Sequence, residues 1–190
     1  MSYKLPSLGQ LIKDAETYST QSINYTFDYS GWEDESGTNR KKDRIFYGRF
    51  GQEWLYRFCK LNELKVDKDN TSEKENDKFD LIISRHIVDV KNSISEGFIG
   101  QVSPGCYKNE KTHFYCFLLT DRELSYVEPL GFISAGDFKK KCFFVAHDEY
   151  IRNTGMKNKF IDGSYFVDRD KLVDFYMSIE VLRAVGDIAI

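Results

Sequence analysis

Apolar residues recur at helical spacing in three stretches of the chain. The first follows Ser7, a residue type that caps helix N-termini. The second predicts a long amphipathic helix over about 44–62, and the third predicts a final helix over about 170–183. The positions that carry these patterns are Leu8, Leu11, Ile12 and Ala15, then Phe46, Phe50, Trp54 and Phe58, then Leu172, Val173, Tyr176, Ile179 and Leu182. Gly48 and Gly51 lower the helix propensity of the second stretch and allow close backbone packing there.

Continuous apolar runs predict the strands. The runs cover 78–84, 86–91, 113–120 and 142–146, with shorter runs at 124–127 and 131–133. Residues 92–105 contain three glycines and a proline and predict a loop. Ser134 caps a basic helix that ends at Lys141. The order helix, strands, helix, strand, helix predicts an α/β fold in which helices flank a mixed central β-sheet.

Length and composition favour one ordered domain over residues 1–190. The core is expected over about 44–145, followed by a C-terminal extension and helix over 146–190. The 15 Phe and 12 Tyr residues are typical of a packed globular protein. The net charge of −3 excludes a bulk polycation, so a nucleic-acid partner must be held by local basic patches. The candidate patches are Arg40, Lys41, Lys42 and Arg44, and Lys139, Lys140 and Lys141, although a solvated helix face explains each run about equally well.

The cysteines and the N-terminus bear on the cellular setting. The four cysteines form no Cys-x-x-Cys pair, and the three histidines are scattered among them, so a structural zinc site is not expected. The first residues contain no apolar signal core, and no segment approaches the length of a membrane span. We therefore expect a soluble protein of the reducing cytoplasm, with free thiols and no membrane contact.

Charged residues stand at fixed places in the hairpin predicted over 78–91. Asp80 lies in its first strand, and Asp89 and Lys91 end its second. Residues two apart in a strand point to the same face, so Asp89 and Lys91 are expected to share a site while Val90 turns into the core. Charged groups inside an apolar hairpin are costly unless they are satisfied. Two carboxylates beside one ammonium can hold a divalent cation and an activated water, which indicates a nuclease.

An acidic-x-Lys tripeptide alone is weak evidence, because the chain holds three of them. Glu63–Lys65 stands at a predicted helix end and Asp137–Lys139 within a predicted helix. Only Asp89–Lys91 ends an apolar strand that follows another acid in a neighbouring strand, with a glutamate-bearing helix upstream. The alternative is an ordinary ion pair on one face of the hairpin, which contributes little on a surface.

With these residues in this order, the sequence resembles the PD-(D/E)XK superfamily of restriction-endonuclease-like nucleases. The matching positions are Glu53, Asp80, Asp89 and Lys91. The resemblance covers about residues 44–120 and implies a restriction-endonuclease-like core. Phe79 stands where the family's nominal proline would be, which leaves Asp77 as a competitor for the first acid position.

The resemblance implies hydrolysis of a phosphodiester that depends on Mg²⁺, with Mn²⁺ able to substitute, and leaves a 5′-phosphate and a 3′-hydroxyl. The implied metal ligands are Asp80, Asp89, the Val90 carbonyl and Glu53. The implied catalytic residues are the same three acids with Lys91, which would orient the water, and Gln101, which would touch that water or a phosphate. A plain loop amide is the alternative role for Gln101.

We expect a DNA endonuclease, because the chain lacks the appended helicase and long insertions of processive exonucleases. Small cutters of this kind occur in restriction, homing, resolvase and phage-encoded roles. Double-strand cutting needs two active sites, so a homodimer is expected, with the helix over 170–183 either as interface or as a cover for the core. The alternatives are an RNA-directed nuclease and a non-catalytic nucleic-acid- or protein-binding module on the same fold.

Overall fold

The computed structural model describes residues 3–22, 40–68, 80–94, 100–152, 154–158, 160 and 162–187. The helices are α1 (Leu8–Ser22), α2 (Arg40–Leu61), α3 (Pro104–Tyr107), α4 (Ala135–Lys141) and α5 (Phe175–Asp187), with a short 3₁₀ helix η1 (Arg169–Lys171). The strands are β1 (Val66–Lys68), β2 (Leu81–Ile83), β3 (His86–Ser93), β4 (Gln101–Val102), β5 (Phe114–Thr120), β6 (Val127–Ser134), β7 (Phe143–Val145) and β8 (Ser164–Phe166).

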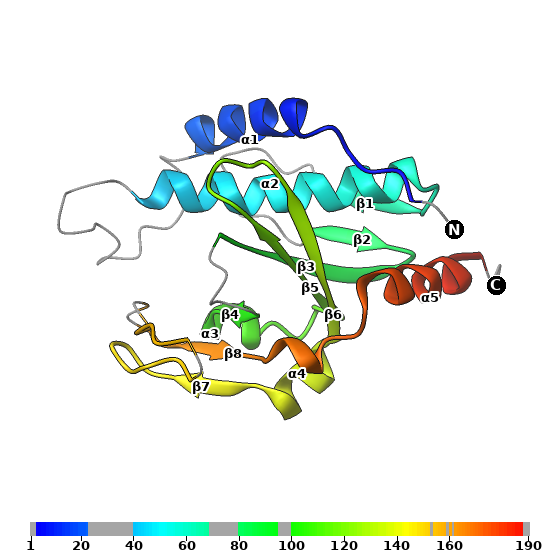
Figure 1. Cartoon of the computed structure of the whole chain (residues 1–190). Coiled ribbons are helices and arrows are strands. Elements are labelled where there is room, and N and C mark those ends of the chain that lie inside the picture. Colours follow the sequence, from blue (N-terminus) through cyan, green and yellow to red (C-terminus); the bar gives the residue numbers. More distant parts are fainter. Residues whose placement is uncertain are drawn as a thin grey trace.

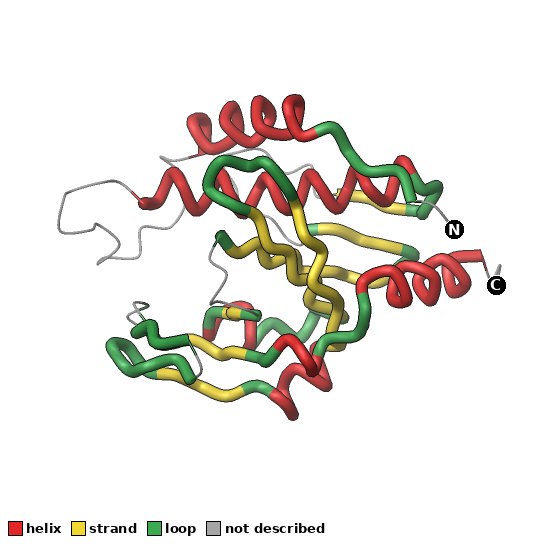
Figure 2. Tube along the Cα trace, viewed as in Figure 1, coloured by secondary structure: helices red, strands yellow, loops and turns green. Residues whose placement is uncertain are grey.

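Five of the described strands form the central sheet, in the order β1-β2-β3-β5-β6 (Figure 1). Strands β3 and β5 run parallel and every other neighbouring pair runs antiparallel. Helices α1 and α2 lie along one side of this sheet, as Figure 2 shows with helices in red and strands in yellow. The predicted α/β fold with a mixed central sheet flanked by helices is therefore confirmed.

Alternation along β3 and β5 divides the core between the two faces of the sheet. Val88 and Val90 pack with buried residues of α1, α2 and α5 on the first face. Tyr115 and Phe117 pack on the second face, against Phe138 of α4 and the buried residues near β4 and β8. Because successive side chains of a strand point to opposite faces, the residues between the two valines of β3 belong to the second face.

A smaller sheet, in the order β4-β8-β7, covers part of the second face (Figure 1). Strand β8 pairs antiparallel with both neighbours, so Tyr165 stands opposite Val102 on one side and Phe144 on the other. Strand β4 lies where the sequence predicts a loop, and β8 lies in the C-terminal extension, where the sequence predicts no strand. Two- and three-residue strands carry too few apolar positions for a periodic pattern, and only their pairing reveals them.

The segment predicted as a loop over 92–105 differs most from expectation. Strand β3 continues to Ser93, and α3 follows β4 directly. Ser103 caps α3, since its Oγ accepts from the Cys106 backbone N–H, and Pro104 occupies the first turn. Proline at that position favours a helix start rather than a loop, because its missing N–H is not needed there.

Two predicted element boundaries are also wrong. The short strand predicted over 131–133 is part of a longer strand, β6, which begins at Val127, the last residue of the run predicted over 124–127. The pairing of β6 with β5 shifts register near Pro129. A bulge at this point lets the strand continue past a proline and a glycine. Helix α5 begins at Phe175 instead of Asp170, because the Asp174 carboxylate accepts from the Met177 N–H and caps the helix there.

The described helices include none that is long and apolar enough to cross a bilayer. All four cysteines are free thiols, as the sequence predicts. Cys59 and Cys116 are buried, and burial raises the pKa of the Cys59 thiol to about 12. These two residues are small core residues, in agreement with the sequence-based expectation.

Candidate active site

Asp80 lies directly before β2, at the open end of the β2–β3 hairpin. Leu81 pairs with Val88, so one further step of this register places Asp80 beside Asp89. The Val90 N–H donates to the Asp80 Oδ2 at 2.7 Å. The carboxylate thus accepts the hydrogen bond that a backbone carbonyl of a neighbouring strand would usually accept. The strand predicted from residue 78 is described only from Leu81, and Asp77 lies outside the described residues.

Asp89 and Lys91 point to the second face of the sheet, the same face as their register partners Tyr115 and Phe117 in β5. The Lys91 Nζ lies 2.6 Å from the Asp89 Oδ1. Their side chains are 23% and 15% exposed, so the pair is largely enclosed but open to water on one side. The structure thus brings three of the predicted site residues, Asp80, Asp89 and Lys91, into one cluster, which we call the hairpin site.

Burial and like charge perturb both kinds of group in the hairpin site. Burial, together with the Asp89 carboxylate beside it, raises the pKa of Asp80 to about 8. Burial alone would lower the pKa of the Lys91 ammonium, but the Asp89 and Asp80 carboxylates outweigh it and raise that pKa. Lys91 therefore stays charged, whereas the raised pKa of Asp80 favours its protonated form unless another cation enters the site.

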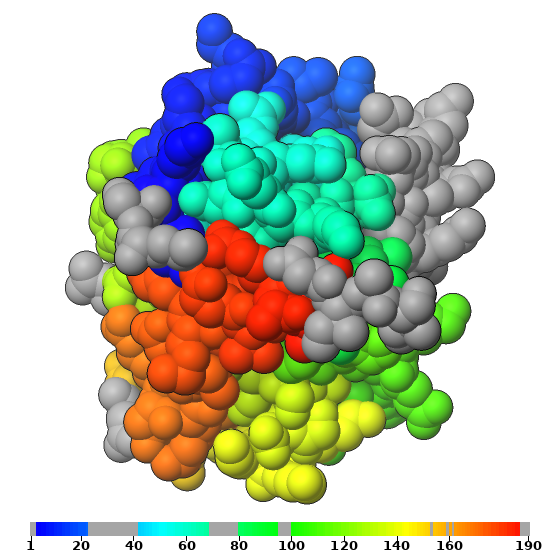
Figure 3. Space-filling model, turned by 90° about the vertical axis from the view of Figure 1, so that its right-hand side faces the viewer, coloured from blue at the N-terminus to red at the C-terminus, as the bar shows by residue number. Residues whose placement is uncertain are grey.

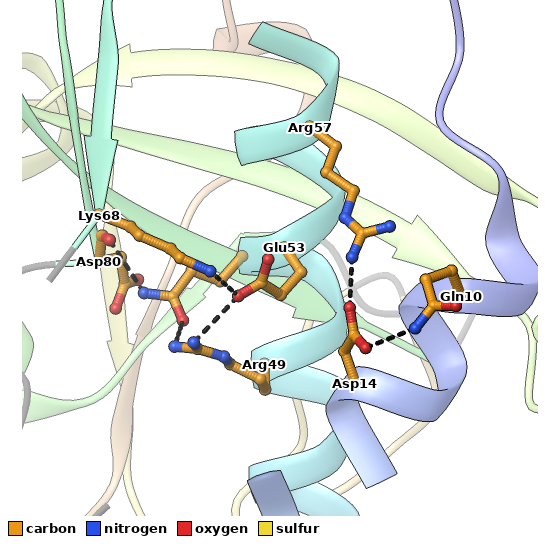
Figure 4. A network of polar contacts seen from close by, with 8 residues as sticks. Gln10, Asp14, Arg49, Glu53, Arg57, Lys68 and Asp80 are labelled. Carbon is orange, nitrogen blue, oxygen red and sulfur yellow. Dashed lines mark hydrogen bonds and ion pairs between the residues drawn. The ribbon is translucent and has the colours of Figure 1, made fainter. Parts of the chain in front are cut away.

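Glu53 lies on α2, which packs on the first face of the sheet, away from Asp89. Figure 4 shows its carboxylate between two cations: Oε1 is 2.7 Å from the Lys68 Nζ and 2.9 Å from the Arg49 guanidinium. Its neighbour Gln52 donates from Nε2 to the Asp80 backbone oxygen at 2.9 Å. Helix α2 thus supports the start of β2, but the Glu53 carboxylate is engaged in ion pairs of its own. Its predicted role as a metal ligand stays a prediction.

Gln101 lies on β4 instead of in a loop, and its Nε2 donates to the Ser164 Oγ of β8 at 2.8 Å. This hydrogen bond joins two strands of the smaller sheet. Among the described residues, no hydrogen bond or ion pair joins Gln101 to the hairpin site, so its predicted catalytic role stays a prediction.

Cys106 is a residue of the site that the sequence analysis missed. The Lys91 Nζ donates to its Sγ at 3.4 Å, and the Tyr115 hydroxyl donates to its backbone oxygen at 3.0 Å. Helix α3 therefore forms a wall beside the catalytic candidate Lys91. The only sequence signal was the Ser103–Pro104 helix start, which places a cysteine in a helix but gives no hint of its neighbour.

The two predicted basic patches lie on different helices. Arg40 and Lys41 begin α2, but their side chains lie outside the described part of the structure. Lys42 is half-buried, and the exposed Arg44 places its guanidinium 4.7 Å from the centre of the Phe160 ring. The second patch consists of the exposed residues Lys139, Lys140 and Lys141 at the end of α4.

A pocket of about 630 Å³ opens at the other end of the hairpin. His86, His113 and Lys139 are among the residues that line it. The Ile87 N–H donates to the His113 Nδ1 at 3.1 Å, which fixes that ring nitrogen as an acceptor. The acids of the hairpin site do not line this pocket, so it is a separate feature.

The donors of the hairpin site suit Mg²⁺. The described residues contain no group of three or more acidic, histidine or cysteine side chains that could hold a metal ion. Mg²⁺, however, commonly binds through one or two carboxylates and keeps several waters. In a strand the N–H and C=O of one residue point to the same side, so the Val90 carbonyl faces the edge on which its N–H meets Asp80. Asp80, Asp89 and this carbonyl are therefore a fitting donor set, and a cation would offset the repulsion between the carboxylates.

The chain was compared with protein-family models, curated proteins and solved structures. None of the three comparisons finds a match.

Proposed function

We propose that this protein is a Mg²⁺-dependent nuclease that hydrolyses phosphodiester bonds of DNA at the hairpin site. The observation that carries the proposal is the meeting of Asp80, Asp89 and Lys91 at the open end of one hairpin. Two close carboxylates and one enclosed ammonium are unusual in an apolar sheet unless they are used. The strand order, with antiparallel β1-β2-β3 followed by parallel β5, is compatible with the restriction-endonuclease-like core that we propose.

Each residue of the hairpin site has a distinct role in this proposal. Asp80 is oriented by the Val90 N–H, so that its carboxylate and the Val90 carbonyl face the same edge. Asp89 holds Lys91 by an ion pair at 2.6 Å. The Lys91 ammonium orients the attacking water and stabilises the negative charge that grows on the phosphate.

Mg²⁺ held by Asp80, Asp89 and the Val90 carbonyl would lower the pKa of a bound water and neutralise phosphate charge. The chain itself supplies the orientation of the two acids and keeps Lys91 protonated. Glu53 contributes in this scheme by fixing α2 against β1, through its ion pair with Lys68.

The test is cleavage of supercoiled plasmid, linear duplex, single-stranded DNA and RNA in Mg²⁺ or Mn²⁺. We expect cleavage of DNA that EDTA abolishes and that Asp80→Asn reduces at least a hundredfold. Asp67→Asn, a change at an exposed aspartate of β1, is the matched control and should cut normally. Preferential cleavage of RNA would show that RNA is the substrate instead of DNA. The absence of cleavage by folded protein would favour the non-catalytic binding module.

We further propose that the protein acts in the cytoplasm and forms a homodimer through α5. Figure 3 looks onto this helix, whose outer side carries Met177, Val181 and Val185, exposed by 61%, 58% and 42%. Phe175, Ile179 and Leu182 already bury the inner side of α5 in the core. Sedimentation velocity should show a dimer, and Val181→Glu should convert it to a monomer; a monomeric parent protein would contradict the dimer alone.

A further inference from the structure

A row of aromatic rings runs from α3 to β7, the outer strand of the smaller sheet, which covers part of the second face of the central sheet. The rings of Tyr107 and Tyr165 lie face to face, with centroids 3.8 Å apart and planes inclined by 9°. The Phe144 ring follows, with its centroid 5.1 Å from that of Tyr165. We call these three residues the aromatic row. Phe144 and Tyr165 are cross-strand partners in β7 and β8, so the sheet itself fixes their spacing.

The outer end of the row is open to solvent. Phe144 is 51% exposed, whereas the central rings Tyr107 and Tyr165 are half-buried. Gly163 approaches the Phe144 ring so closely that an added Cβ would lie 2.3 Å from its Cζ. The ring is therefore held in place from below while much of its surface remains available.

Cations flank the inner end of the row. The Lys139 Nζ lies 5.7 Å from the centre of the Tyr107 ring, and Lys140 and Lys141 follow on the same short helix. All three lysines are exposed, and no ion pair with a carboxylate engages them in the described part of the chain. Such cations beside aromatic rings suit a partner that alternates negative charge with flat apolar faces.

The row begins next to the hairpin site. Tyr107 follows Cys106, whose Sγ accepts from the Lys91 Nζ at 3.4 Å and whose backbone oxygen accepts from the Tyr115 hydroxyl. Helix α3 thus joins the candidate catalytic lysine to the first ring of the row. The first ring of the row therefore belongs to the residue next to one that contacts Lys91.

We propose that the aromatic row and the lysines of α4 bind unpaired nucleotides next to the cleavage site, so that the substrate contains a single-stranded segment. This inference rests on the proposed nuclease function and narrows its substrate class. In a duplex, neighbouring base pairs cover the faces of each base, whereas an unpaired base can stack on an aromatic ring. The lysines supply phosphate contacts that do not depend on sequence.

The test is the affinity for a short labelled oligothymidylate, measured by fluorescence anisotropy in EDTA so that no cleavage occurs. Phe144→Ala should weaken binding about tenfold, as expected for loss of one stacked base. Phe144→Leu, which keeps an apolar side chain over Gly163, should weaken it to a similar degree. Tyr126→Ala removes a ring that is 39% exposed outside the row and should leave the affinity unchanged.

A second readout detects stacking directly. Phe144→Trp should retain the affinity of the unchanged protein, and the fluorescence of the new indole should fall when the oligonucleotide binds.

Lys140→Ala should reduce the slope of log affinity against log salt by about 0.7, the value for one phosphate contact of a single strand.

Three results would overturn the inference: no binding of single strands, equal binding by Phe144→Ala, or no change in the Phe144→Trp fluorescence. The nuclease proposal is judged separately, by cleavage in Mg²⁺. Cleavage lost in Asp80→Asn together with unchanged binding by Phe144→Ala would remove the row from the substrate site and leave the nuclease standing. Binding that depends on Phe144 without cleavage in Mg²⁺ or Mn²⁺ would support the row and contradict the nuclease.

Discussion

At the residue scale, the main result is that contacts within one hairpin bring two acids and a lysine together. Asp80 bonds to the Val90 amide and Asp89 pairs with Lys91, so both contacts arise within residues 80–91. Ionising Asp80 in this position is unfavourable, because the side chain is buried beside a second carboxylate, and its pKa is therefore raised. A bound cation would reduce the repulsion between the two carboxylates, which is the property expected of a cation site.

The raised pKa of Asp80 predicts a pH dependence of stability. The pKa is about 8 in the folded protein against 3.8 for an ordinary aspartate, so the folded state binds more protons between these values. The free energy of unfolding in EDTA should therefore fall as the pH rises from about 4 to about 8. Asp80→Asn should flatten this dependence and be the more stable protein at pH 8.

Urea unfolding at a series of pH values measures this effect. Asp67→Asn, at an exposed position of β1, should keep the slope of the parent protein. An unchanged slope in Asp80→Asn would show that Asp80 ionises normally in the folded protein.

Glu53 tests the difference between a structural and a metal-binding carboxylate. Its side chain is 5% exposed and lies between Lys68 and Arg49. Glu53→Gln should lower the free energy of unfolding by about 2–3 kcal/mol, below the range for fully buried pairs because the cations keep some contact with water. The matched change Glu128→Gln, in an exposed pair with Arg169, should cost less than about 1 kcal/mol.

Denaturant unfolding of both variants gives these free energies, and a thermal shift in Mg²⁺ gives the second readout. A folded Glu53→Gln protein that keeps the Mg²⁺ shift would assign the carboxylate to packing. Loss of that shift would establish Glu53 as the third carboxylate ligand that the resemblance implies.

The sequence predicts that Asp89 and Lys91 lie together because their geometry is local. Alternation fixes the shared face of Asp89 and Lys91, and both follow from counting along one strand. The contact of Cys106 with Lys91 could not be predicted in this way, because it depends on how α3 folds back over β3. Glu53 illustrates the same limit: its helix is predicted correctly, but its partner Lys68 belongs to a three-residue strand with no periodic signal.

At the scale of the elements, close packing of α2 on β3 holds the hairpin in place. A Cβ added to Gly51 would lie 2.6 Å from the Asn92 Cβ, whereas one added to Gly48 would meet nothing within 4 Å. The Asn92 Nδ2 also donates to the Tyr47 backbone oxygen at 3.0 Å. The close backbone approach predicted for these two glycines is thus confirmed at Gly51 and does not occur at Gly48.

These two glycines form a matched pair of tests. Gly51→Ala should destabilise the protein by about 1–3 kcal/mol, because α2 must move away from β3. Gly48→Ala should stabilise it by about 0.5–1 kcal/mol, since alanine has the higher helix propensity and finds open space. Thermal or denaturant unfolding gives both values, and the same sign for the two changes would contradict the packing described for α2.

The long helices and the central strands β2, β3 and β5 are predictable because each lies within a periodic or continuous apolar pattern, whereas the three-residue edge strand β1 has no such pattern. The smaller sheet is not predictable, because β4 and β8 have two and three residues and pair only through the fold. The course of β6 through Pro129 depends on a register shift against β5 that no local pattern reveals. Pairing between distant segments therefore accounts for most of what the sequence leaves open.

At the scale of the whole molecule, Mg²⁺ should stabilise the folded protein. A ligand that binds only the folded state at ten times its dissociation constant adds about 1.4 kcal/mol, or roughly 3–6 °C in Tm for a chain of this size. The shift should vanish in Asp80→Asn and in Asp89→Asn but persist in Asp67→Asn. Differential scanning calorimetry with and without Mg²⁺ measures it, and an equal shift in all three variants would place the binding site elsewhere.

The measurement that tests the central claim most directly is the rate of plasmid nicking by the parent protein and Lys91→Met in Mg²⁺. Methionine keeps much of the side-chain volume but removes the ammonium that pairs with Asp89. We predict a loss of about 10²–10³-fold in rate, the usual effect of removing one group that stabilises developing charge. Lys111→Met, at an exposed lysine, should nick at the parent rate. Equal rates for the parent protein and Lys91→Met would show that the hairpin site does not carry the reaction.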